Sequence, residues 1–319
     1  SLFVGAALIS ACGLAGHAVF PQLSVTAWGA LHSLVIALLV LAGGYSLFEG
    51  VMKALVGVMV VTLVGCAFWL RTPWEVALSS LTQAGLPAGG LGLTLGILGG
   101  VGGSLTLLSY GYWIREKGWQ GPQWLRVVRF DLTVAYGVTG LFGVAIMVLA
   151  AAVLHTEGIT VEGAAGVANM AEILARVLGP AGRWIFLAGF WAAVATSMLG
   201  VWQGVPYLFC DLLAMLRGQR GAEREAALST RTLPYRLYLA WLAIPPLALV
   251  AQGRPVALVV LYAIVGALFM PFLAGSLLIM NRRDDWVGAL KSGWLAQFML
   301  VAALALFGWI GLTKILEAF

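Results

Sequence analysis

Long apolar stretches separated by short basic gaps dominate this sequence and restrict what it can fold into. A helix needs about 20 mostly apolar residues to cross the hydrocarbon core of a bilayer. Nine stretches approach or exceed that length: 1–20, 24–45, 48–70, 91–114, 130–154, 181–213, 234–251, 256–280 and 288–316. They lack the alternation of barrel strands, so they predict an all-α polytopic membrane protein with about nine transmembrane helices.

The composition excludes several classes of soluble protein. Hydrophobic residues make up 61% of the 319 residues, charged residues make up 10%, and the mean hydropathy is +0.98. A single soluble domain of this size cannot bury so much apolar surface in one core. These values argue against an ordinary soluble enzyme, a nucleic-acid-binding module and a disordered chain, and they make the lipid bilayer the first expected partner.

The basic residues predict the orientation of the chain in the membrane. The gaps at 46–53, 115–129, 214–236 and 281–291 hold 13 of the 18 Lys and Arg residues. Loops rich in Lys and Arg stay in the cytoplasm, so these four gaps are expected on that side. The net charge of +5 is thereby explained without nucleic acid. We expect a multi-pass protein of the bacterial inner (plasma) membrane, whose N-terminal part precedes Ser1.

Charged residues give little sign of catalysis. No Asp, Glu, Lys or Arg occupies the centre of an expected span. Asp131 and Asp211 lie near cytoplasmic ends, where we interpret them as interfacial anchors or as partners of Arg129 and Arg217. The sequence shows no metal-ligand spacing, no Ser-His-Asp arrangement and no phosphate loop in a suitable context. We therefore expect no enzyme and no cofactor.

Glycines clustered within segment 91–114 mark the first candidate site. Four glycines within five residues weaken a helix, since each costs about 1 kcal/mol relative to Ala. Unwound backbone inside a membrane exposes carbonyl oxygens that bind ions in transporters. A second half-helix would begin near the serine that follows the cluster. The candidate residues are Gly99, Gly100, Gly102, Gly103, Ser104, Thr106, Ser109 and Tyr110.

Two interpretations of this segment compete. Gly92, Gly96, Gly100 and Ser104 repeat every four residues, as at a close helix–helix contact. Such packing does not require four glycines within five residues, so the clustering favours a broken helix. Weaker candidates for a polar cavity are Ser197 and Gln203 in segment 181–213 and Tyr262 in segment 256–280.

The order and spacing of several motifs resemble a known family, the Nramp-type divalent metal transporters. The similarity covers nearly the whole chain, as helices three to eleven of that family. It rests on residues 45–59 (YSLFEGVMKALVGVM), the glycines 99–103 followed by 105–119 (LTLLSYGYWIREKGW), residues 129–131 (RFD), residues 178–182 (LGPAG) and residues 270–272 (MPF).

The resemblance implies a LeuT-like inverted-repeat transporter fold, truncated at the N-terminus. In that fold, residues 1–319 form a single transmembrane domain. Residues 1–70 are the last three helices of the first repeat, 91–280 are the five helices of the second repeat, and 288–316 are an extra C-terminal helix. The family's first, broken helix carries its acidic metal ligand and would precede this chain.

Departures from the family pattern bear on the substrate. The family's Met-Pro-His motif falls on Thr106-Leu107-Leu108, and the acidic pair of its third helix falls on Ala7 and Ser10. Hard oxygen ligands favour Mg²⁺ or Mn²⁺ over softer metals. We therefore expect a secondary transporter that moves a divalent cation by alternating access. The alternatives are a carrier of amino acids or other small organic molecules with the same fold, and a non-transporting membrane scaffold.

Overall fold

The computed structural model describes residues 1–70, 94, 106–151, 165–267 and 269–318, and every regular element among them is helical. The longer helices are α1 (Leu2–Val19), α2 (Val25–Met59), α6 (Thr106–Glu116), α7 (Leu125–Ala150), α8 (Ala165–Leu178), α9 (Pro180–Leu216), α11 (Leu233–Ala243), α13 (Pro255–Ala267), α14 (Phe269–Arg282) and α16 (Trp294–Ala318). The shorter ones are η1 (Val60–Val64), α3 (Gly65–Trp69), η3 (Pro122–Trp124), α10 (Gly221–Ala227), α12 (Leu247–Val250), α15 (Asp284–Val287) and η5 (Gly288–Leu290).

Six of the described helical stretches are long and apolar enough to cross a membrane. They are Leu2–Val19, Val25–Trp69, Pro122–Ala150, Pro180–Leu216, Leu233–Val250 and Pro255–Arg282. These stretches confirm the predicted all-α polytopic class. The expected total of nine stays a prediction, because most of segment 91–114 lies outside the described residues.

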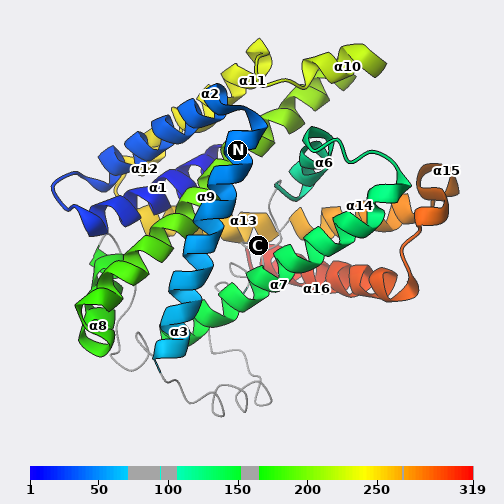
Figure 1. The fold of residues 1–319 in the computed structure, drawn as a ribbon. Coiled ribbons are helices and arrows are strands. Elements are labelled where there is room, and N and C mark those ends of the chain that lie inside the picture. The colour runs from blue at the N-terminus through cyan, green and yellow to red at the C-terminus, as the bar shows by residue number, and fades with distance from the viewer. Residues whose placement is uncertain (71–93, 95–105, 152–164, 268, 319) are drawn as a thin grey trace. The chain divides into compact units, whose positions relative to one another are not determined.

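A glycine interrupts the longest helical stretch. Gly44 has φ 62° and ψ 179° inside α2, which is non-helical backbone that only glycine adopts without strain. The break falls one residue before the predicted end of segment 24–45, close to the start of segment 48–70. The second part of α2 continues through the π-helical η1 into α3 (Figure 1). The two predicted helices therefore follow each other with almost no loop.

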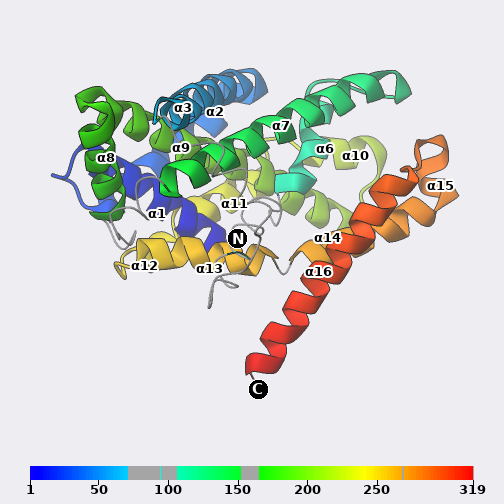
Figure 2. The same ribbon diagram turned by 90° about the horizontal axis from the view of Figure 1, so that it is seen from below.

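The chain divides into two compact units. Among the described residues, the first unit comprises 1–70, 108–151 and 165–259, and the second comprises 94, 106–107, 260–267 and 269–318. In the second unit, α14 and α16 pack against each other (Figure 2). In the first unit, α9 contacts α1, α2, α8 and α11 and is the central helix.

Glycines allow α1 and α2 to approach closely. A Cβ atom added to Gly13 would lie 2.2 Å from the backbone oxygen of Val25, and one added to Gly29 would lie 2.6 Å from the oxygen of Ile9. The turn between the helices is fixed by Ser24, whose hydroxyl accepts a hydrogen bond from the Ala27 N–H and so caps α2. Small residues at these contacts hold the pair together as a hairpin.

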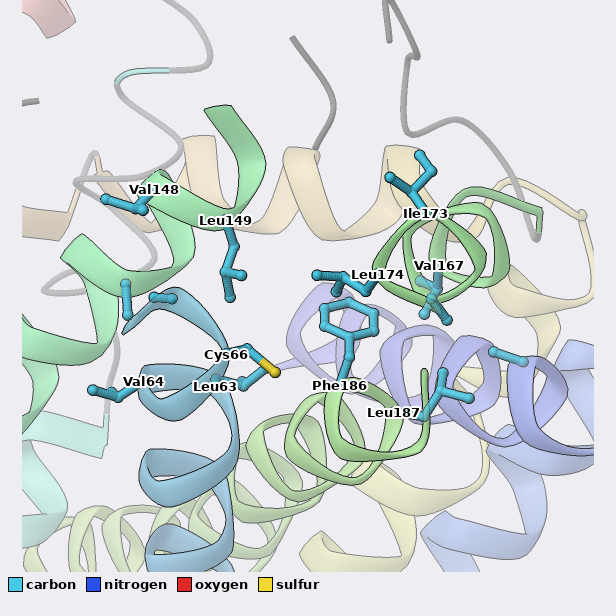
Figure 3. Close-up of a cluster of buried hydrophobic side chains, with 14 of the residues drawn as sticks. Leu63, Val64, Cys66, Val148, Leu149, Val167, Ile173, Leu174, Phe186 and Leu187 are labelled. Carbon is cyan, nitrogen blue, oxygen red and sulfur yellow. The ribbon is translucent and has the colours of Figure 1, made fainter. Parts of the chain in front are cut away.

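A hydrophobic cluster joins several helices of the first unit (Figure 3). It includes Leu63 of η1, Leu149 of α7, Leu174 of α8 and Phe186 of α9, each 2% exposed or less. Cys66 of α3 lies in the same cluster, and all three cysteines are buried free thiols. This packing fixes one end of α9, while the polar groups described next lie toward its other end.

Candidate functional site

The first candidate residue with a described environment is Ser109, which lies where α6 crosses α9. A Cβ atom added to Gly204 of α9 would be 2.6 Å from the Ser109 hydroxyl, so the missing side chain allows the close crossing. Ser109 is fully buried, and its hydroxyl has no hydrogen-bond partner within the described structure. A buried, unpaired hydroxyl costs about 1–3 kcal/mol, which marks this oxygen as one available to a bound water or ligand.

Gln203 lies beside the same crossing. Its side-chain oxygen accepts a hydrogen bond from the indole N–H of Trp113, one turn along α6 from Ser109, at 2.5 Å. Its backbone oxygen accepts a hydrogen bond from the Tyr235 hydroxyl of α11 at 2.8 Å. Gln203 is 3% exposed, so this predicted cavity residue holds three helices together.

Tyr110 points toward α7. Its hydroxyl donates a hydrogen bond to the Asp131 carboxylate at 2.7 Å. Both residues line a cavity of about 160 Å³ between α2, α6 and α7. Glu49 lines the same cavity and pairs with Lys53 at 2.6 Å and with Lys117 at 2.8 Å. Two carboxylates, two phenols and two ammonium groups therefore line one small cavity, together with apolar side chains.

A second polar network lies one to two turns further along α6 and α9. Asp211, with a 10% exposed side chain, accepts two hydrogen bonds from Arg224 of α10, at 2.6 and 2.8 Å, and one from Tyr112 at 2.7 Å. The Glu116 carboxylate accepts a hydrogen bond from the Tyr207 hydroxyl at 2.9 Å. The Asp211 carboxylate raises the pKa of the Arg224 guanidinium above its ordinary value. These bonds fasten α10 to the ends of α6 and α9.

Of the two interpretations of Asp131 and Asp211, the pairing with Arg129 and Arg217 was wrong, and the role as interfacial anchors stays a prediction. Asp131 bonds to Tyr110, and Asp211 bonds to Arg224 and Tyr112, in place of Arg129 and Arg217. Residues separated by two positions, or by six, do not face each other on a helix, whereas residues three or four apart do. Sequence reasoning also missed Glu116 and Tyr207. The available signal was the acidic residue Glu116, two positions after the apolar segment 91–114.

The remaining candidates are less defined. Gly99, Gly100, Gly102, Gly103 and Ser104 lie outside the described residues, as does the predicted helix break. The helix that follows them, α6, begins at Thr106. The Ser197 side chain is exposed, and its hydroxyl donates to the Ala193 oxygen of its own helix at 3.0 Å. Tyr262 is partly buried and belongs to the second unit.

Comparison with known proteins identifies one family. A family model described as natural resistance-associated macrophage protein-like (Nramp) matches residues 2–317. No curated protein matches the chain. The described residues contain no group of three or more His, Cys, Asp and Glu side chains arranged to hold a metal ion. The match covers the same nearly complete length as the motif resemblance.

Proposed function

Because the chain belongs to the Nramp family, whose members transport divalent metal cations and are not enzymes, we propose that it carries Mg²⁺ or Mn²⁺. It is an integral, multi-pass membrane protein with a LeuT-like transporter fold. In our proposal it works in the bacterial plasma membrane. One helix bundle rocks against the other, so that a site near the bilayer midplane opens to each side in turn.

Hydroxyl oxygens support the choice of ion. Thr106 begins α6, and Ser109 follows three positions later in the sequence. Neither residue offers the sulfur that attracts softer transition metals. Mg²⁺ binds oxygen and retains several waters, so it needs few protein ligands. Backbone carbonyls of the glycine cluster before α6 would complete the oxygen shell in this proposal.

The observation that carries the proposal is the unpaired hydroxyl of Ser109. It is fully buried, at a crossing that Gly204 keeps close. A serine that served only to pack helices would ordinarily satisfy its hydroxyl on the backbone, as Ser197 does. An oxygen left without a partner favours a bound ion or one of its retained waters.

Cation uptake into proteoliposomes that hold the full-length protein tests this function. We expect saturable uptake of Mg²⁺ or Mn²⁺, and an internal pH dye should show no acidification. If the dye reports acidification, the transporter is proton-coupled. If folded protein takes up neither ion, the cation proposal is wrong and an organic substrate or a non-transporting role takes its place.

Two variants test the site itself. Ser109→Ala and Thr106→Leu should each weaken apparent cation affinity by about tenfold, the scale on which supporting groups of metal sites act. Thr139→Val is the matched control, because the exposed Thr139 hydroxyl bonds only to the Ala135 oxygen of its own helix. Uptake that is the same in all three variants would remove Ser109 and Thr106 from the site, and the choice of Mg²⁺ or Mn²⁺ would lose its structural support.

A further inference from the structure

Two adjoining cavities lie at the end of α9 that leads into α10. The first is small and partly polar, with a volume of about 170 Å³, and the second is an apolar groove of about 500 Å³. Leu213, Arg217 and Pro234 line both. The shared walls connect the cavities, so one elongated molecule with a polar end and an apolar end can occupy the two together.

The groove presents an apolar surface between α9 and α11. Phe209 and Tyr238 stack with their ring centroids 4.5 Å apart and join its two sides. Leu233 and Leu237 also line it, and they are 67% and 60% exposed. The α11 side belongs to the spanning stretch Leu233–Val250, so the groove opens where hydrocarbon is expected. Its volume lies within the range of about 300–1,000 Å³ typical of ligand pockets.

The small cavity offers donors for an anion. Arg217 caps the C-terminus of α9, and within the described structure its guanidinium has no side-chain partner. Gln219 and Thr232 line the cavity beside it, and Ala227 of α10 forms a further wall. That wall is held in place because Arg224 of α10 bonds twice to the buried Asp211. One wall of the cavity is therefore formed by α10, whose position is fixed by the Arg224–Asp211 pair.

We propose that these two cavities form a binding site for an anionic phospholipid of the cytoplasmic leaflet. An acyl chain occupies the groove, and the phosphate accepts hydrogen bonds from Arg217 and Gln219. The charge pattern favours this occupant, because the gap 214–236 carries five arginines and is assigned to the cytoplasm. A second copy of the chain fits less well, since a symmetric contact through this face would bring the same arginines together.

Lipid retention by the purified full-length protein tests the site. Native mass spectrometry is carried out after addition of phosphatidylglycerol or phosphatidylcholine with identical acyl chains. Arg217→Gln should weaken phosphatidylglycerol retention about fivefold, the loss expected for one basic residue near a phosphate. Arg220→Gln is the matched control, because this exposed arginine lies three positions away and lines neither cavity. Equal retention in the two variants would overturn the proposal.

The groove is tested separately. Leu237→Trp fills the space beside α11 and should lower the retention of both lipids, whereas Leu216→Trp, at an exposed position outside both cavities, should not. Equal retention of phosphatidylcholine and phosphatidylglycerol by the unmodified protein would contradict an anionic site. Stabilisation by inorganic phosphate alone, to the same extent as by phosphatidylglycerol, would show that a free anion is the ligand. A dimer lost in Leu237→Trp would show that a second copy covers the groove.

Fluorescence quenching by lipids tests the site in protein that keeps Arg217 and Leu237, so the result does not depend on whether variants at these two positions fold. Trp241 lines the groove. Its contribution to the tryptophan fluorescence is the difference between the spectra of the unmodified protein and of Trp241→Phe. Phosphatidylglycerol with brominated acyl chains should quench that part more strongly than brominated phosphatidylcholine does. Equal quenching by the two lipids would mean that the groove contacts bulk lipid without selecting the headgroup, and the proposal would fail.

Discussion

Asp211 is a carboxylate on a long apolar helix, and its environment shows how such a charge is tolerated. Its side chain is 10% exposed and receives three hydrogen bonds, two of them from Arg224. Burying a charge is costly unless it is paired and hydrogen-bonded. The intact pair therefore contributes little net stability, whereas the loss of one partner is strongly destabilising, because it leaves the other charge buried and unpaired.

This asymmetry predicts the outcome of a double-mutant cycle. Arg224→Gln alone should reduce the free energy of unfolding by about 2 kcal/mol, because it leaves the Asp211 carboxylate with one strong donor. Asp211→Asn combined with Arg224→Gln should recover part of that loss, since no unpaired charge remains. Thermal unfolding of the detergent-purified protein measures both effects. Strictly additive losses would mean that the two side chains do not interact in the membrane protein.

At the scale of the elements, glycine determines which helices come close. Gly13 and Gly29 lie at the α1–α2 contact, where added Cβ atoms would meet backbone oxygens. Gly137, in α7, has open space around its Cβ position. The same residue type therefore has opposite consequences in two apolar helices. Its effect depends on whether a neighbouring backbone is within reach.

Alanine substitutions distinguish these two environments. Gly13→Ala should destabilise the protein by about 1–3 kcal/mol, because the 2.2 Å approach to the Val25 oxygen forces the helices apart. Gly137→Ala should be neutral or stabilising by up to about 1 kcal/mol, because alanine favours the helix. Thermal unfolding midpoints of the two variants provide the comparison. Similar destabilisation in both would show that an unseen partner contacts Gly137.

At the scale of the whole molecule, the distribution of basic residues makes a prediction about sidedness. The gap 214–236 is assigned to the cytoplasm, and the short gap around Gln252 to the opposite side. Cysteines introduced as Arg220→Cys and Gln252→Cys should react with a membrane-impermeant maleimide from opposite faces of oriented vesicles. The three native cysteines are buried and give a low background. Labelling of both positions from one face would contradict the predicted topology.

Helical spans could be predicted from the sequence because their signals are local. The length of an apolar run and the basic residues beside it identify stretches such as Leu2–Val19 without knowledge of any partner. Side-chain pairing across helices is not local. Tyr112 and Asp211 are 99 positions apart, and Arg224 reaches Asp211 only because the chain turns back after α9. The acids could be recognised in the sequence, but their partners depend on how helices cross.

The break at Gly44 has a consequence for the path of all later residues. An unbroken helix over the 45 residues Val25–Trp69 would be about 68 Å long, more than twice the hydrocarbon thickness of about 30 Å. Divided at Gly44, the same residues form two arms, each long enough for one crossing. One pivot residue thus decides whether the stretch traverses the membrane once or twice. One crossing more or fewer would place every later loop on the opposite side of the membrane.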